Sequence, residues 1–339
     1  MIPPLMLKAL RAYVRHAPAL GKPWLAGHLS EYLKHHPLTT TALTRTGTVF
    51  PVTTSDVIQR YLWLFGTWEP HLTAWMRHRI TPGDLVIDVG AHTGYFTVLA
   101  SQLTGPTGRV VAIEASPAFH QALKGNIEAN GCTNVRTVNA AVSDTPGRMT
   151  YYLERSTNLG GTTAVRPRTV VSSFETEAAT LPNLVTDDEL AAARLIKIDI
   201  EGGEAAAVRG LTPVLHRLRP EAELVIEVTP QMLAKQGQQT DDVLAPLREQ
   251  GFHVYRLAND YAAASYPAAL RRPAPAVRWH GPVTEMSDLV FSRTDAETLP
   301  PLIGRARRST ARLRGPGQYE SQLYALYGRV VPTSQGRRA

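Results

Sequence analysis

Short apolar runs alternate with amphipathic stretches from residue 84 to residue 292. The apolar runs are rich in Val, Ile and Leu and predict buried strands near residues 85–89, 109–114, 135–140, 195–200, 223–228, 252–257 and 287–292. The amphipathic stretches have apolar residues at helical spacing and predict helices near residues 94–103, 117–130, 203–217 and 240–250. This alternation predicts an α/β fold in which a mostly parallel sheet is covered by helices on both faces.

The first part of the chain follows a different order. Residues 1–38 contain two segments with helical spacing, and residues 39–54 alternate β-branched side chains around Gly47, which predicts a hairpin. Asp56 offers an N-cap for a helix over Val57–Phe65. We therefore expect a helical and hairpin extension ahead of the sheet.

A long insertion separates the third and fourth predicted strands. Residues 151–194 are polar and rich in Gly and Thr, and an insertion of this length favours a lid or a wall of a substrate site over a structureless loop. We divide the chain into an N-terminal extension, a main domain that contains the insertion, and a basic tail, over residues 1–60, 61–298 and 299–339.

The distribution of charge along the chain and the number of cysteines exclude several classes of protein. The net charge of +7 lies in the tail, because residues 301–339 contain eight arginines and one acid, whereas the body has 28 basic and 28 acidic side chains. A neutral body argues against a nucleic-acid partner. A single cysteine, Cys132, excludes a disulfide framework and fits a cytoplasmic protein. Early prolines at the N-terminus argue against a secretory signal, and no apolar run is long enough to span a membrane.

The sequence D-L-V-I-D-V-G-A-H-T-G-Y at residues 84–95 predicts a ligand-binding turn. A strand ends at Asp88, Gly90 allows a ligand close to the backbone, and Gly94 leads into a helix whose N-terminal amides face the crevice. The dinucleotide fingerprint G-x-G-x-x-G has glycine where this chain has Asp88. A carboxylate there repels a pyrophosphate and attracts an ammonium group. The motif therefore favours S-adenosylmethionine (SAM) over NAD, with a nicotinamide-dependent oxidoreductase as the second hypothesis.

Glu114 ends the second predicted strand, 24 residues after Gly90. An acid at this place in dinucleotide-binding folds accepts hydrogen bonds from both ribose hydroxyls. The alternative is a purely structural role beside the helix start at Ser116. Together with the upstream turn, Glu114 favours the ribose role.

A second acidic group follows the fourth predicted strand in L-I-K-I-D-I-E-G-G-E, residues 195–204. We expect Asp199 and Glu201 to face the crevice, because strand ends bind ligands in open α/β sheets and residues two apart share a strand face. Glu204 is interpreted as a helix-start acid. An alternative is that Asp199, Glu201 and Glu227 gather Mg²⁺. The structural alternative is that these acids cap helices or pair with basic residues.

These motifs occur in the order D-x-G-A-H-T-G-Y-F-T, V-x-A-I-E-A-S-P, N-I-E-A-N-G, N-A-A-V-S-D and I-K-I-D-I-E-G-G-E. The order resembles the FkbM-type family of SAM-dependent methyltransferases over roughly residues 45–295. The resemblance implies a seven-stranded Rossmann-like class I methyltransferase sheet with one reversed edge strand, and O-methylation of a hydroxyl on a sugar or other secondary metabolite. It also implies that SAM lies beside Glu69, Asp88, Gly90, His92, Gly94, Glu114, Ala115, Asn139 and Ala141.

Methyl transfer from a sulfonium needs an aligned acceptor, exclusion of water and a base for the acceptor proton. We expect Asp199 to be this base, with His92 and His280 as further candidates, although His92 is interpreted rather as a hydrogen-bonding residue of its loop. The expected partner is a small hydroxylated substrate, and the formation of a homo-oligomer stays open. N-directed or metal-assisted methyl transfer and a non-enzymatic SAM-binding protein also stay open.

Overall fold

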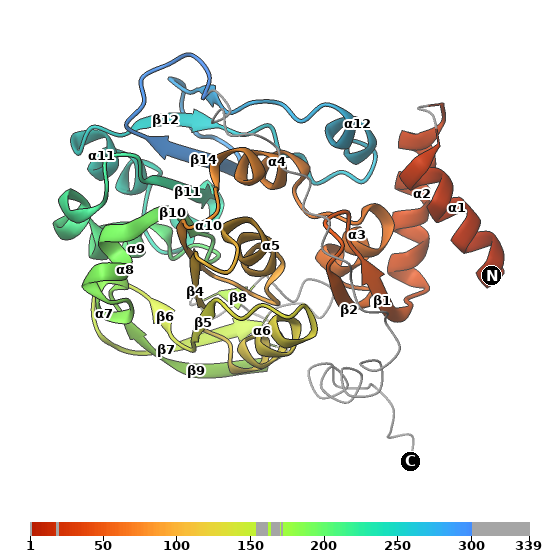
Figure 1. The fold of residues 1–339 in the computed structure, drawn as a ribbon, viewed down its shortest axis with the longest axis horizontal. Coiled ribbons are helices and arrows are strands. Elements are labelled where there is room, and N and C mark those ends of the chain that lie inside the picture. Colours follow the sequence, from red (N-terminus) through yellow and green to blue (C-terminus); the bar gives the residue numbers. More distant parts are fainter. Residues whose placement is uncertain (1, 18–19, 154–161, 164–169, 171, 300–339) are drawn as a thin grey trace.

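The computed structural model describes residues 2–17, 20–153, 162–163, 170 and 172–299. Its centre is an eight-stranded sheet in the order β13-β12-β14-β11-β10-β3-β4-β5 (Figure 1). The bounds of these strands in chain order are β3 Leu85–Val89, β4 Arg109–Ile113, β5 Val135–Val138, β10 Ala193–Ile198, β11 Glu223–Val228, β12 His253–Arg256, β13 Val277–Arg278 and β14 Ser287–Ser292. The strands β5, β4, β3, β10 and β11 are parallel, so the sheet is of the Rossmann-like class I methyltransferase type.

All seven predicted strands are present, and the structure corrects three details of the sheet and its helices. The reversed strand β14 is not at the edge but lies two places inside it, because it pairs antiparallel with both β11 and β12. The short strand β13 is an eighth strand at the edge beside β12. The helix predicted over 203–217 ends at Leu211 and continues as a 3-10 turn, because Pro213 lacks the amide hydrogen that an α-helix requires.

Helices cover both faces of the sheet. They are α5 Tyr95–Thr104, α6 Pro117–Ala129, α9 Glu204–Leu211, α10 Pro230–Lys235, α11 Asp241–Glu249 and α12 Tyr266–Arg271. Alternate strand residues supply two separate cores: Val86 packs in one cluster with α5, and Ile87 packs in the other with α9 and α11. This is the period-two alternation of a strand buried on both faces.

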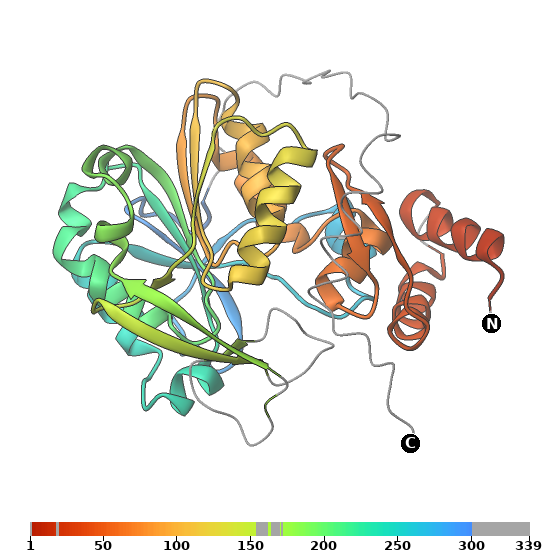
Figure 2. The same cartoon turned by 90° about the horizontal axis from the view of Figure 1, so that it is seen from below.

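The predicted N-terminal extension and the segment that follows it pack into the first of these cores. Their elements are α1 Pro4–His16, α2 Lys22–His35, β1 Thr39–Leu43, β2 Val49–Thr53, α3 Val57–Phe65, which crosses residue 60, and α4 Pro70–Arg79, which lies beyond it. Leu29 and Phe50 belong to the same buried cluster as Val86. Arg15 of α1 donates hydrogen bonds to the carbonyls of Leu62 and Leu64 near the end of α3. Figure 2 shows the two helices and the hairpin on one side of the sheet. The division at residue 60 stays a prediction.

Residues 141–179 form a second sheet in the order β6-β9-β7-β8, which begins ahead of the predicted insertion at residues 151–194. Its strands are β6 Ala141–Val142, β7 Gly147–Leu153, β8 Thr162–Thr163 and β9 Ser172–Ala179, and the short helices α7 Leu181–Leu184 and α8 Asp187–Ala192 follow. Residues 158–161 of the Gly- and Thr-rich stretch and the basic tail from residue 300 lie outside the described residues. Within the described part, no helix is long and apolar enough to cross a bilayer.

Candidate functional site

A cleft opens where β3, β4 and β10 end. This is the place where the strand order reverses direction between β3 and β10, and open α/β sheets bind ligands at such a point. The cleft is lined by Ile58, Val89, Gly90, His92, Ile113, Glu114, Ala115, Phe119, Ala140, Ala141, Val142, Tyr151, Asp199, Ile200 and Glu201. The structure thus brings together most of the residues that the sequence predicted for the site.

Gly90 and Gly94 occupy positions where a side chain does not fit. Gly90 has φ +80°, and a Cβ atom there would lie 1.8 Å from the backbone oxygen of Asp199. Gly94 has φ +90°, and its Cβ would lie 2.5 Å from Leu123 Cδ1. Both torsions lie in the left-handed region that favours glycine. The β3 turn can therefore pack against β10 while its backbone faces the cleft.

Glu114 fixes the loop around it. Its carboxylate accepts hydrogen bonds from the backbone amides of His92 at 2.7 Å and Ser116 at 2.8 Å. Burial raises the pKa of Glu114 to about 7, although these two amides oppose the shift. Asn139 donates from Nδ2 to the carbonyls of Glu114 and Ala115. Glu114 thus orders one wall of the cleft, and the ribose role stays a prediction.

Asp88 lies in the protein interior and is not among the residues that line the cleft. Its Oδ2 accepts a hydrogen bond of 2.6 Å from the Thr97 hydroxyl, and Oδ1 is buried without a hydrogen-bond partner. It lies opposite Lys197 in the pairing of β3 with β10. Burial raises the pKa of Asp88, and the Lys197 charge and the Thr97 hydrogen bond oppose that shift. The sequence placed this carboxylate beside the SAM ammonium, and that contact stays a prediction.

Asp199 lies at the wall of the cleft, and its side chain is 26% exposed. Lys197 Nζ donates to Asp199 Oδ2 at 2.8 Å. Burial alone lowers the pKa of Lys197, but the carboxylates of Asp199, Asp88 and Glu69 outweigh it and raise the pKa. Lys197 and Asp199 thus form an ion pair at the end of β10.

The prediction that Asp199 and Glu201 share a strand is wrong in detail. Strand β10 ends at Ile198, and the chain then turns, with φ +55° at Glu201 and +103° at Gly202. Both carboxylates still line the cleft. Burial, together with the negative charges of Asp199 and Glu204, raises the pKa of Glu201 to about 8. Glu204 accepts hydrogen bonds from the Ile200 and Gly202 amides, which agrees with its structural interpretation.

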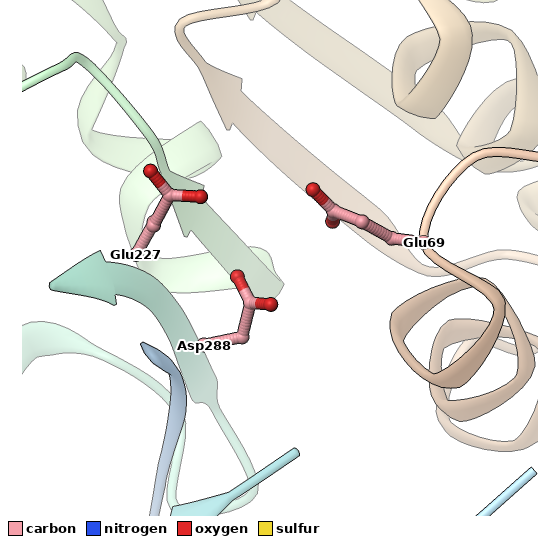
Figure 3. Close-up of side chains that lie close together, drawn as sticks. All are labelled: Glu69, Glu227 and Asp288. Carbon is pink, nitrogen blue, oxygen red and sulfur yellow. The ribbon is translucent and has the colours of Figure 1, made fainter. Parts of the chain in front are cut away.

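A second acidic group lies apart from the residues that line the cleft. Glu69, at the N-terminus of α4, faces Glu227 of β11 and Asp288 of β14 (Figure 3). The Tyr261 hydroxyl lies within hydrogen-bond distance of a carboxylate oxygen of each. Burial and neighbouring carboxylates raise the pKa of all three acids, to about 6 for Asp288. Glu227 of the sequence-predicted metal set therefore groups with Glu69 and Asp288, whereas Asp199 and Glu201 line the cleft.

Several residues of the cleft and of the acidic group were not predicted from the sequence. Phe119, Tyr151 and Ile58 line the cleft, and Asp288 and Tyr261 join the acidic group. Of these residues, only Phe119 has a local sequence pattern that could have placed it near the cleft, because it follows the predicted helix start at Ser116. His280 is exposed and is not among the residues that line the cleft, so its catalytic role stays a prediction.

Part of the chain is similar to a known protein family. Residues 88–254 match the methyltransferase FkbM domain, and this range runs from Asp88 in the first turn into β12. Residues 88–254 are therefore similar to the FkbM-type methyltransferase domain. A similar protein is 31-O-demethyl-FK506 methyltransferase FkbM from Streptomyces tacrolimicus, which is 30% identical over 40% of this chain and 64% of that relative. A protein-L-isoaspartate O-methyltransferase from Aeropyrum pernix is 41% identical over 16% of this chain and 21% of its own length. The chain thus spans under two thirds of these relatives.

A solved structure of a similar fold is methyltransferase FkbM from Methylobacillus flagellatus KT. It has 17% sequence identity and a TM-score of 0.35, and the match covers 63% of this chain and 44% of that one. The strand order of this protein, rather than that match, establishes the fold of the FkbM-type domain.

Proposed function

We propose that this protein is a SAM-dependent methyltransferase that uses the cleft at the ends of β3, β4 and β10 to bind SAM. The observation that supports the proposal most directly is Gly90, where a Cβ would overlap the Asp199 carbonyl, so the turn leaves bare backbone facing the cleft. Glu114 offers carboxylate oxygens for hydroxyl groups, and Ala115, Phe119 and Ala141 offer an apolar wall for a base.

When bound, SAM supplies a methyl group on a positively charged sulfur. The residues of the chain then have three tasks: to align the acceptor, to exclude water and to take up a proton. Asp199 is our proposed proton acceptor, because it lies at the cleft wall and remains partly exposed. Lys197 orients it through Oδ2. Tyr151 of the insertion covers part of the cleft, which supports the prediction that the insertion forms a wall of the substrate site.

We further propose that the acceptor is a hydroxyl on a small molecule. The name of the Streptomyces tacrolimicus relative, 31-O-demethyl-FK506 methyltransferase, supports transfer to oxygen. Neutral charge in the body of the chain supports a small-molecule partner over a nucleic acid. Transfer to nitrogen is the alternative, and product analysis after incubation with methyl-labelled SAM and hydroxyl or amine acceptors separates the two.

The proposed cofactor is tested by calorimetry with SAM and with NAD. We expect the protein to bind SAM and not NAD, and we expect Glu114→Ala to weaken SAM binding by about 1–3 kcal/mol because it removes buried hydrogen-bond acceptors. Glu128→Ala, on the exposed side of the neighbouring helix α6, is the matched control and should bind as the parent does. Binding of NAD without binding of SAM would overturn the proposal.

The raised pKa of Glu114 predicts a pH dependence of SAM binding. The ionised carboxylate is the better acceptor for two hydroxyls, and burial raises the pKa of Glu114 to about 7, so the binding form is lost as the pH falls through 7. We expect SAM to bind about tenfold more weakly at pH 6 than at pH 8. Glu114→Gln removes the titrating group and should flatten this dependence. An unchanged pH profile in Glu114→Gln would assign the dependence to another group.

A further inference from the structure

Three carboxylates from separate elements converge beside the carboxyl end of β11. Glu69 begins α4, Glu227 lies on β11 and Asp288 lies on β14, and one carboxylate oxygen of each lies within 4.8 Å of those of the other two. Figure 3 shows Glu69 reaching across toward the other two side chains. Glu69 is only 3% exposed and Asp288 only 4%. The group is therefore compact and largely removed from water.

The sheet itself forces two of these charges together. Glu227 and Asp288 are directly opposite each other in the antiparallel pairing of β11 with β14. Side chains at opposed positions share a sheet face, and like charges there destabilise the pair. Buried carboxylates need a compensating charge or hydrogen bonds. The negative charge of Glu227 and Asp288 therefore has to be compensated by nearby hydrogen-bond donors or by a positive charge.

The described neighbours do not supply enough donors. The Tyr261 hydroxyl has one proton for Glu69 Oε1, Glu227 Oε2 and Asp288 Oδ2, at 3.1, 3.1 and 3.4 Å. Asn259 donates only to Asp288. Glu69 Oε2 is buried and has no hydrogen-bond partner. The orphaned oxygen belongs to the carboxylate that points into the group. Lys197 is near enough to lower the pKa of Glu69 and of Asp288, but its ammonium is paired with Asp199 Oδ2. Among the described residues, no cationic side chain forms an ion pair with Glu69, Glu227 or Asp288.

We propose that Glu69, Glu227 and Asp288 bind one hard divalent cation, of the class of Mg²⁺, Mn²⁺ or Ca²⁺. Such cations prefer carboxylate oxygens at about 2.0–2.6 Å, so ligand oxygens on opposite sides of one ion lie about 4–5 Å apart. The separation of at most 4.8 Å between the three oxygens matches this span. None of the three residues lines the cleft, so a bare ion fits the group better than an organic ammonium group.

This site differs from the Asp199, Glu201 and Glu227 set that the sequence indicated. Asp199 Oδ2 is already paired with Lys197 Nζ at 2.8 Å, and Glu201 lines the cleft. The new assignment concerns cation binding alone. It is measured without SAM or acceptor, and it can fail while the proposed methyl transfer stands.

The test is a titration of the full chain, first stripped with chelator, with Mn²⁺ by calorimetry and with Tb³⁺ by luminescence. Trp68 and Tyr261 lie with ring centroids 5.4 Å apart beside the group, so both can sensitise a bound Tb³⁺. We expect one equivalent to bind, Mg²⁺ or Ca²⁺ to compete, and Mn²⁺ to raise the melting temperature. Asp288→Asn and Glu69→Gln should weaken binding at least about 100-fold, because loss of a group outside the ligand set already costs about 10–100-fold.

Glu201→Gln is the matched control, since it removes one carboxylate from the neighbouring cleft wall. It should bind Mn²⁺ as the parent does. Circular dichroism checks the fold of each variant, and the parent titration decides the question if a variant fails to fold. Absence of one-to-one Mn²⁺ and Tb³⁺ binding to the parent would overturn the proposal, as would binding that survives in Asp288→Asn but is lost in Glu201→Gln.

Discussion

An Asp199→Asn variant should bind SAM as the parent protein does and turn over about 10²–10⁴-fold more slowly. Asparagine has the shape of aspartate and can still accept the hydrogen bond from Lys197 Nζ, but it cannot take up the acceptor proton. Calorimetry gives the SAM affinity, and transfer of labelled methyl from SAM to a panel of hydroxylated metabolites gives the turnover. A loss confined to turnover is the signature of an interaction made in the transition state.

The variant Glu201→Gln tests whether Glu201, rather than Asp199, takes up the acceptor proton. Glu201 lines the same cleft, and burial raises its pKa to about 8, so it is the competing proton acceptor. If Asp199 is the base, the glutamine variant keeps most of its turnover. Near-normal turnover in Asp199→Asn and a large loss in Glu201→Gln would transfer the role to Glu201.

Gly90→Ala should remove SAM binding and lower the free energy of unfolding by roughly 2–5 kcal/mol. The added Cβ would lie 1.8 Å from the Asp199 carbonyl oxygen and 3.1 Å from Ile200 Cγ2, and φ +80° adds backbone strain. The turn after β3 then has to move away from β10. Denaturant unfolding and calorimetry with SAM measure the two effects.

Gly131→Ala separates torsional strain from overlap. Gly131 has φ +64°, but its Cβ would have no heavy atom within 4 Å. We expect a loss of only about 1–2 kcal/mol in stability and unchanged SAM binding. If both alanine variants lose the same stability and both bind SAM, close packing of Gly90 against the Asp199 backbone is not what shapes the cleft.

The sheet was predictable because its strands carry local patterns. The strand that ends at Val89 is apolar except for Asp88, and it is followed by the two glycines whose positive φ the turn requires. Both its position and its ligand-facing turn therefore follow from nearby residues. Glu114 and Asp199 follow in the same way, since each comes directly after an apolar strand. These residues then meet because parallel strands end at one edge of the sheet.

The acidic group of Glu69, Glu227 and Asp288 was beyond the reach of the sequence. Glu227 and Asp288 are 61 positions apart and meet only because β14 pairs with β11 in one particular antiparallel register. A slip by one residue would turn the Asp288 side chain to the other face. Glu69 reaches them from the start of α4, and Tyr261 from a loop. Long-range register of this kind leaves no local pattern to detect.

The separate sheet of the insertion has an evolutionary consequence. Its strands hydrogen-bond to one another in the order β6-β9-β7-β8, and within the described residues the wall residue that β7 contributes to the cleft is Tyr151. Gly90, Glu114 and Asp199, by contrast, come from the central sheet and the turns that follow its strands. On the proposed function, substitutions in β7 can therefore change the acceptor side of the cleft while Gly90, Glu114 and Asp199 are inherited unchanged.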